Sequence, residues 1–348
     1  MRVLLTKCLL FLAPIGLTLG LSELLLRCIP TSYTIKNAQL AADAGKIELL
    51  ILGNSHATYG LDPQRLSVDA FNAASVNQSL YFDKRITLKY LHALTNLKYV
   101  LISVDFHSLY FSDEGLRNIW SYYGYGINYK DELPATTRYC YLYGYKGPLA
   151  LEFMERRFEK KYDRIRAVDV DYDLDLDHPY IKGYVGKLGS PYLDNFHNRE
   201  RAAFFNDIVR SSKEKENILA DLEGFIDTLK RRNITPILIT LPCFGPFEEL
   251  LDRKVIAQNQ ADIRSICDKW HLSYWDYSSM RLDSNCFYNG DHLNEKGAVV
   301  VTQEVNRKID AMRQTSPSKK SLVISENERK FLERQSSCKP APATGTLF

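Results

Sequence analysis

The sequence predicts a doubly wound α/β fold, in which helices cover both faces of a parallel sheet. Short and almost continuous apolar runs are typical of strands buried on both faces. Such runs occur at residues 47–52, 68–72, 99–104, 235–241 and 272–276. Amphipathic helical patterns alternate with them at residues 80–94, 213–232 and 253–270, and a final helix is expected from residue 294. In such a sheet, ligand sites form at the carboxyl ends of the strands.

The composition is that of a globular protein with a full core. Of 348 residues, 45% are hydrophobic and 25% are charged, which suits one large domain. The 45 basic and 42 acidic side chains give a net charge of +3, so there is no electrostatic case for nucleic-acid binding. The seven cysteines show no C-x-x-C motif and no metal-like spacing, and neither a metal nor an organic cofactor is expected. Cys243, Cys267 and Cys286 either supply one disulfide or are buried free thiols.

The N-terminus has the pattern of a membrane anchor. Arg2 and Lys7 flank an apolar stretch that runs to Leu26, close to the roughly 20 residues that a helix needs to span lipid. No small-x-small cleavage site precedes Arg27, so residues 1–28 are interpreted as a transmembrane anchor or an uncleaved signal; the alternative is a terminal core helix. We expect a single pass through the cytoplasmic (inner) membrane, with the globular domain facing the periplasm or exterior.

The rest of the chain divides into three parts. Residues 29–46 are interpreted as a polar linker, residues 47–312 as the α/β domain, and residues 313–348 as a disordered tail. A tyrosine-rich insertion at about residues 105–210 breaks the alternation with loops and short helices. Its tyrosines either pack a small core of their own or line a sugar-binding groove. The acidic run at residues 169–177 fits a solvated loop better than a calcium site.

Two short blocks, far apart in the sequence, have the character of a hydrolytic site. A Gly53-Asn54 turn leaves Ser55 exposed after the first apolar run, and His292 follows Asp291 just before the final helix. A serine hydroxyl needs a base to remove its proton, histidine is the usual base, and a third group orients the imidazole. Each residue also has a structural alternative, since Ser55 could cap the next helix and His292 could cap or pack at the core edge.

These blocks resemble those of the SGNH, or GDSL-like, hydrolase superfamily, whose fold is flavodoxin-like. Its first block is Gly-Asp-Ser-like, as in Gly53-Asn54-Ser55, and its last block holds Asp and His, as in Asp291-His292. Longer stretches at residues 52–63 and 291–298 resemble membrane-anchored SGNH proteins of bacterial envelopes that act in the O-acylation of surface polysaccharides. The resemblance covers about residues 47–104 and 213–312 and leaves out the insertion.

The resemblance implies roles for the residues of both blocks. Ser55 is the nucleophile, His292 is the base, and Asp291 is the preferred group for orienting the imidazole. The family's acid commonly lies three residues before the histidine, where this chain has Asn289, the second candidate for that role. An asparagine can orient an imidazole but cannot stabilise its charged form as a carboxylate does.

The oxyanion part of the site departs from the family pattern. Asn77 stands near the glycine whose backbone N–H serves the oxyanion, and asparagine tolerates left-handed geometry. Asp105 stands where the family has Gly-x-Asn-Asp, so the oxyanion asparagine is lost or replaced, as in a slow transferase or an inactive relative. His56 and His107 are interpreted as polar packing residues within reach of the pocket.

The sequence therefore predicts the transfer of an acyl group, acetyl or similar, to or from an envelope polysaccharide through an acyl-Ser55 intermediate. The expected partners are a carbohydrate or acylated glycan, the membrane and a membrane-bound O-acyltransferase. One alternative is a carbohydrate or lipid esterase of the same fold. Another is a degenerate domain that binds glycan or scaffolds the acyltransferase. A nucleotide-binding domain is disfavoured, because no glycine-rich phosphate loop follows the first strand.

Overall fold

The computed structural model describes residues 2–27, 31–112, 116–127, 140 and 180–315. The acidic run at residues 169–177, most of the tyrosine-rich insertion and the predicted tail from residue 316 onward lie outside these residues. The chain divides into two compact units, residues 1–304 and 305–348. Within the described residues, the second unit consists of the end of the last helix.

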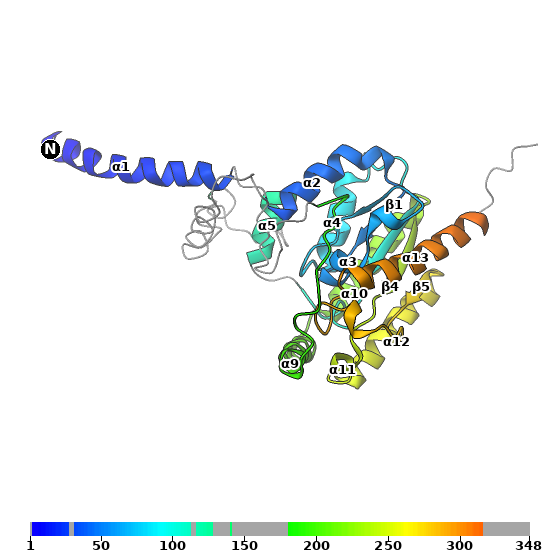
Figure 1. Cartoon of the computed structure of the whole chain (residues 1–348). Coiled ribbons are helices and arrows are strands. Elements are labelled where there is room, and N and C mark those ends of the chain that lie inside the picture. The colour runs from blue at the N-terminus through cyan, green and yellow to red at the C-terminus, as the bar shows by residue number, and fades with distance from the viewer. Residues whose placement is uncertain (1, 28–30, 113–115, 128–139, 141–179, 316–348) are drawn as a thin grey trace, which may run out of the picture. The chain divides into compact units, whose positions relative to one another are not determined.

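A parallel five-stranded sheet forms the centre of the first unit (Figure 1). The strands are β1 (Leu49–Leu52), β2 (Ala70–Asn72), β3 (Tyr99–Ser103), β4 (Thr235–Thr240) and β5 (Ser273–Asp276). Their order is β2-β1-β3-β4-β5, and all neighbours run parallel. The chain moves first to one side of β1 and then to the other, as in a flavodoxin-like doubly wound sheet. The predicted α/β fold class is confirmed.

Helices connect and flank these strands (Figure 1). The α-helices are α1 (Arg2–Arg27), α2 (Ser32–Asp43), α3 (Ser55–Gly60), α4 (Leu80–Tyr90), α5 (Leu116–Tyr125), α9 (Asn195–Ser211), α10 (Lys215–Arg231), α11 (Gly245–Glu248), α12 (Arg253–Trp270) and α13 (Glu295–Thr315). Short 3₁₀ turns are η1 (Ala44–Lys46), η2 (Pro63–Arg65) and η3 (Ser284–Cys286). Asp62 caps the start of η2, since its side chain accepts the Gln64 N–H.

The core lies between the sheet and the apolar stripes of the helices. All residues of β1, β2 and β3 are buried, which explains their continuous apolar sequences. On α10 the buried residues recur at helical spacing, namely Leu222, Phe225, Ile226 and Leu229. They join side chains of α4, α12 and the sheet in one cluster. Each fully buried side chain of this size stabilises the fold by about 1.5–3 kcal/mol.

Residues 29–46, predicted as a polar linker, contain the helix α2. Thr31 and Thr34 form a reciprocal capping box at its start. Tyr33 and Leu40, seven residues apart, lie on one face and join the core. The linker prediction was wrong for α2, because the capping box and two large buried side chains stabilise a helix in a segment of polar composition.

The end of the predicted insertion forms α9, a helix of 17 residues, where only short helices were expected. The Asp194 side chain caps it by accepting the backbone N–H groups of Phe196 and His197. Its buried face carries Ala202, Phe205 and Val209. These few apolar residues are enough to hold the helix in place, because Ala202 and Phe205 pack on residues distant in the sequence, such as Phe247.

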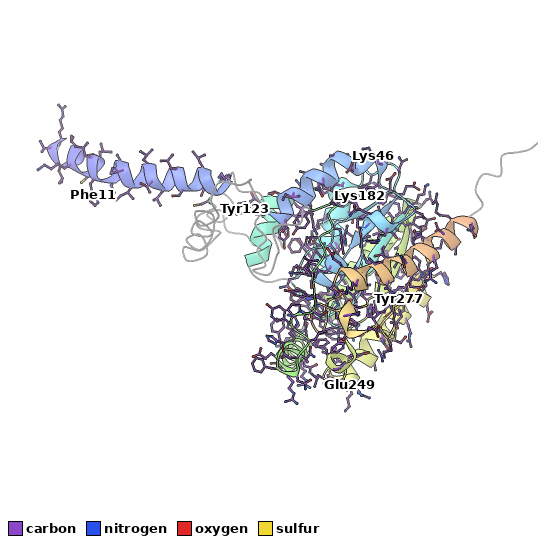
Figure 2. All side chains as sticks on the ribbon, viewed as in Figure 1. Phe11, Lys46, Tyr123, Lys182, Glu249 and Tyr277 are labelled. Carbon is purple, nitrogen blue, oxygen red and sulfur yellow. The ribbon has the colours of Figure 1, made fainter. Side chains whose placement is uncertain are left out.

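α1 is long and apolar enough to cross a membrane. The candidate span is Arg2–Leu24, with 23 residues, and none of its apolar window is buried in the described structure. Phe11, labelled in Figure 2, is 70% exposed. An exposed apolar helix of this length fits an N-terminal membrane anchor, and a signal sequence has the same properties.

The turn after β1 depends on a glycine. Gly53 has a φ of +134°, a backbone conformation that L side chains rarely adopt. A Cβ atom on Gly53 would lie 2.5 Å from Ser103 Cβ at the end of β3. The Gly53 N–H donates to Asp83 Oδ1 at 3.0 Å, and its carbonyl accepts the Ser75 N–H at 3.1 Å. Sterics and hydrogen bonds together fix this corner.

Gly53→Ala is expected to destabilise the protein by about 2–4 kcal/mol. The added methyl group would meet Ser103 in a conformation that alanine already disfavours. Urea unfolding measures the difference in the free energy of unfolding. Gly45→Ala is the matched control, since the nearest atom to its added carbon, Thr95 Oγ1, is 4.0 Å away. Equal effects of the two substitutions would contradict the crowding at Gly53.

Candidate active site

Ser55 is the first residue of α3, directly after the carboxyl end of β1. Asn54 is the N-cap of this helix, and its side-chain oxygen accepts the His56 backbone N–H at 2.9 Å. Because Asn54 performs the capping, the Ser55 hydroxyl is available to another partner. Ser55 is buried, with 7% of its surface exposed, although the sequence predicted an exposed serine. The side chains of the last block cover it.

His292 reaches Ser55 from the other end of the sequence. Its Nε2 atom lies 2.7 Å from Ser55 Oγ, within hydrogen-bond distance, and both residues are buried. The turn before α13 is shaped by Asn289, whose side-chain oxygen accepts the backbone N–H groups of Asp291 and His292 at 3.2 and 2.9 Å. Asn294 then caps α13, as predicted. The structure thus brings together the residues predicted as nucleophile and base.

His292 is held as a neutral imidazole. Burial lowers its pKa to about 3; Asp291 opposes this shift, and the neighbouring cations add to it. A neutral ring can accept the Ser55 proton at Nε2 when Nδ1 carries the ring hydrogen. The Tyr59 ring packs edge-to-face on His292, with the ring centres 5.3 Å apart. The imidazole therefore lies against an aromatic ring as well as against Ser55.

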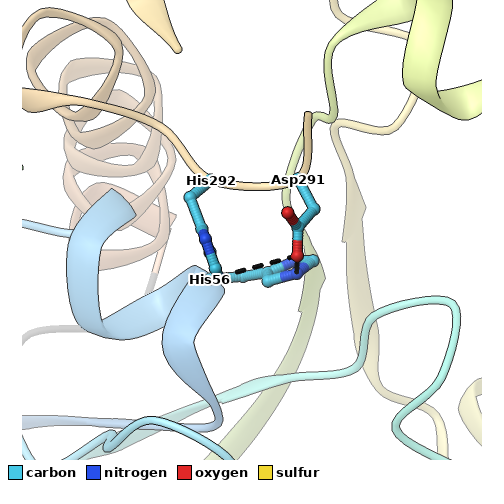
Figure 3. Close-up of side chains that lie close together, drawn as sticks. All are labelled: His56, Asp291 and His292. Carbon is cyan, nitrogen blue, oxygen red and sulfur yellow. Dashed lines mark ion pairs between the residues drawn. The ribbon is translucent and has the colours of Figure 1, made fainter. Parts of the chain in front are cut away.

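His56, next to Ser55, lies between two buried carboxylates. Its Nδ1 is 3.2 Å from Asp105 Oδ1, and its Nε2 is 3.4 Å from Asp291 Oδ2. Figure 3 shows His56 beside Asp291 and His292. The contacts are ion pairs by distance, since neither His56 nitrogen has hydrogen-bond geometry to a described residue. Burial opposes the charge, but the two carboxylates outweigh it and raise the pKa of His56 to about 10. This shift favours the imidazolium form of His56.

Asp291 also binds a second cation. Arg201 of α9 donates from Nε to Oδ1 at 2.6 Å and from Nη2 to Oδ2 at 2.7 Å. Burial opposes ionisation of this carboxylate, but the surrounding His292, Arg201 and His56 side chains hold its pKa well below the usual range. Asp291 Oδ2 lies 3.7 Å from His292 Nε2, on the side of the ring that faces Ser55. The orienting role of Asp291 stays a prediction.

The other predicted site residues take different places. Asp105, two residues after β3, is buried and accepts the Ser103 hydroxyl at 3.0 Å. Burial opposes its charge, but His56 keeps the pKa of Asp105 below its usual value. Asn289 uses its side-chain oxygen on the backbone of the turn. Asn77 is exposed and has a left-handed φ of +53° in the loop before α4. The oxyanion and orienting roles of these residues stay predictions.

Three groups of the site have the residue types of a metal centre. One atom each of His56, Asp291 and His292 lies within 4.8 Å of the other two. These atoms already have partners, since Arg201 binds both oxygens of Asp291 and Ser55 contacts His292 Nε2. Arg201 on both oxygens and His56 beside Oδ2 already place positive charge around this carboxylate, which disfavours a metal ion there. The arrangement fits charge pairing and proton transfer better than metal binding.

Three titratable residues around the site were not predicted from the sequence. Arg201 binds Asp291 from α9. Lys187 is buried, with its Nζ 4.9 Å from the centre of the Tyr59 ring. Asp83 lies in the first turn of α4 and is fully buried. Charged residues on amphipathic helices usually face solvent, so periodicity alone could not reveal these contacts.

Asp83 supports the corner that carries the nucleophile. Its Oδ1 accepts the Gly53 N–H at 3.0 Å and the Gln78 side-chain amide at 2.6 Å. Its Oδ2 has no hydrogen-bond partner among the described residues. Burial raises the pKa of Asp83 to about 7; the two hydrogen bonds oppose this shift, and Asp105 adds to it. Asp83 therefore keeps its proton at mildly acidic pH.

Comparison with known proteins finds distant similarity to solved structures. No family model matches the sequence, and no curated protein matches it. Similar solved structures include a GDSL-like lipase from Bacteroides thetaiotaomicron VPI-5482, with 12% identity over 80% of this chain and 96% of that chain and a TM-score of 0.37. A candidate acylhydrolase from Bacteroides fragilis NCTC 9343 has 14% identity, covers 79% and 94%, and has a TM-score of 0.38. A catalytic mutant of an acetylxylan esterase from Geobacillus stearothermophilus has 11% identity, covers 75% and 93%, and has a TM-score of 0.35.

The TM-scores of these solved structures are all below 0.5. Their identities and TM-scores assign no activity to this chain. Its function is therefore inferred from the geometry of its own side chains.

The raised pKa of Asp83 predicts a pH dependence of stability that Asp83→Asn removes. Between the ordinary pKa of 3.8 and about 7, the folded protein keeps a proton that the unfolded chain has lost. The stability contribution of Asp83 therefore falls as the pH rises through this window. The free energy of unfolding of the wild type, minus that of Asp83→Asn, should fall by about 1.4 kcal/mol per pH unit. Urea unfolding across the window measures it, and a constant difference would contradict a protonated Asp83.

Proposed function

We propose that the protein transfers an acyl group, acetyl or similar, to or from an envelope polysaccharide through an acyl-Ser55 intermediate. The observation that carries this proposal is the 2.7 Å contact between Ser55 Oγ and His292 Nε2 in a buried site. The SGNH-like blocks around the two residues support an enzyme of that type. The placement of Ser55 after β1 also agrees, because sites of doubly wound sheets form at the carboxyl ends of strands.

In the first half-reaction, Ser55 Oγ attacks the acyl carbonyl carbon while its proton passes to His292 Nε2. The bond from Oγ to carbon forms, the bond from carbon to the leaving oxygen breaks, and His292 gives the proton to that oxygen. His292 becomes charged only during this step, because burial holds its pKa at about 3. The carboxylate of Asp291, 3.7 Å from Nε2, stabilises the transient imidazolium.

In the second half-reaction, a hydroxyl group of the acceptor takes the place of the leaving oxygen. His292 removes its proton, the acceptor oxygen bonds to the acyl carbon, and Ser55 leaves with the proton restored to its Oγ. A sugar hydroxyl as the acceptor gives transfer, and water gives hydrolysis. A carbohydrate or lipid esterase would differ from a transferase only in this step.

A small cavity of about 10 Å³ lies beside Asn54 and His107, with room for no more than one water molecule. A larger cavity of about 400 Å³ shares Ser79, Leu80 and Phe111 with it, and its lining includes neither Ser55 nor His292. The size of the larger cavity suits a ligand such as a short saccharide or an acyl donor.

Aromatic rings that continue outward from His292 support a carbohydrate substrate. Tyr59 packs on His292, and Lys187 Nζ lies over the rings of Tyr59 and Tyr288, at 4.9 and 5.0 Å from their centres. Tyr192 packs on Tyr288 with the ring centres 5.5 Å apart, and it is 38% exposed. Flat aromatic rings can stack on the faces of sugars while their polar edges stay hydrated.

The apolar α1 supports the proposed location. As an uncleaved anchor it would hold the domain at the outer face of the cytoplasmic membrane, where an envelope polysaccharide is accessible. A membrane-bound O-acyltransferase is the proposed partner, because an acyl group activated inside the cell has to cross the membrane before it reaches Ser55.

Incubation of the full-length protein with p-nitrophenyl acetate is expected to acetylate Ser55, as detected by peptide mass spectrometry. Ser55→Ala removes the nucleophile and His292→Ala removes the base, so each should slow acetylation by about 1000-fold or more. Ser67→Ala, at an exposed serine, is the matched control and should react like the wild type. Acetylation of Ser55→Ala at the wild-type rate would contradict the proposal.

The fate of the acetyl group separates the alternatives. With an oligosaccharide present, an O-acetylated sugar indicates transfer, whereas free acetate alone indicates an esterase. A protein that is never acetylated, together with normal glycan modification in a His292→Ala strain, would indicate a scaffold without catalysis.

A further inference from the structure

His56 links three parts of the active site. It follows Ser55 in α3, while Asp105 follows β3 and Asp291 lies in the turn before α13. The side chains of His56, Asp105 and Asp291 are each at most 1% exposed. One ring nitrogen lies 3.2 Å from Asp105 and the other 3.4 Å from Asp291. Because both nitrogens face carboxylate oxygens away from water, both carry a proton.

We propose that His56 is a positioning residue: as an imidazolium, it joins Asp105 to Asp291 and so holds the turn that carries His292 against Ser55. The inference rests on the proposed function, because it gives His56 a role toward the same pair. His56 does not touch the reacting atoms. Its ring lies edge-to-face with that of His292, at 5.3 Å between centres, and it acts through Asp291 and through its charge.

The charge of His56, rather than its shape, is what the site requires. Asp105 Oδ1 has no hydrogen-bond partner among the described residues, and His56 is the cation beside it. Asp291 has Arg201 as a further partner. A neutral His56 would carry a proton on one nitrogen only and would leave one carboxylate facing a lone pair. A buried carboxylate without a counter-charge is strongly unfavourable. The carboxylate would then take up a proton, or the segments that carry Asp105 and Asp291 would move apart.

The same charge acts on the base. The titratable and charged groups that face His292 are Asp291 from its own turn, His56 and Tyr59 from α3, Arg201 from α9 and Lys187 from the segment before α9. Those that face His56 are Asp105, His107, Asp291 and His292. Loss of the His56 charge leaves the surroundings of His292 more negative. His292 then takes up a proton at higher pH. The acidic limb of the pH–rate profile of Ser55 acetylation therefore shifts to higher pH.

The test compares Ser55 acetylation against pH in the full-length wild type, His56→Gln and the double variant His56→Gln/Asp105→Asn. Glutamine cannot carry a charge, and the second substitution removes the carboxylate left without a partner. We expect His56→Gln to slow acetylation about 10–100-fold and to move the acidic limb up by about one pH unit. The double variant should recover part of the rate. His92→Gln, the same substitution at an exposed histidine, is the control and should match the wild type.

Nitrogen NMR of the labelled histidine side chains gives a readout independent of turnover. In the wild type, His56 should carry two ring protons at neutral pH. A neutral His56 overturns the inference, even if the variant fails to fold. In folded His56→Gln, an acidic limb and a His292 titration that match those of the wild type also overturn it. If Ser55 is never acetylated, the proposed function fails, while the two NMR titrations still decide the role of His56.

Discussion

Two carboxylates without access to solvent, Asp105 and Asp291, determine how the active site is built. Each side chain is at most 1% exposed, and an ionised carboxylate buried without a partner costs several kcal/mol. His56 lies between the two, and Arg201 binds Asp291 with two hydrogen bonds, so two negative charges meet two positive ones. The four groups come from α3, the end of β3, α9 and the turn before α13. The same segments bring Ser55 and His292 together, with His292 Nε2 2.7 Å from Ser55 Oγ.

This arrangement gives the neighbouring side chains of His56 and His292 different charge states. Carboxylates on both sides outweigh burial and raise the pKa of His56 to about 10. Burial dominates at His292 and lowers its pKa to about 3, so it stays neutral beside Ser55. In the proposed mechanism one histidine transfers a proton and the other compensates charge, and these two roles require different environments. The backbone corner at Gly53, tied to Asp83, fixes the start of α3, which carries Ser55 and His56.

The sequence was sufficient for the features that depend on local pattern. Short, mostly apolar runs predicted all five strands. In β1 and β3 the run is almost continuous because every position is buried, whereas β5 is buried only at Trp275. The blocks around Ser55 and His292 predicted which side chains would meet. The sequence could not assign a charge to His56, which was interpreted as a packing residue, nor find Arg201. Their roles come from contacts with Asp105 and Asp291, and no local pattern encodes contacts across such long separations.

The claim that buried charges position a reactive pair is tested most directly by a crystal structure of the protein after reaction with a fluorophosphonate. We predict phosphorus bonded to Ser55 Oγ and His292 Nε2 within hydrogen-bond distance, about 3 Å, of an oxygen of the adduct. His56 should remain between Asp105 and Asp291. Phosphonylation of a different residue, or an imidazole of His292 turned away from Ser55, would contradict the claim.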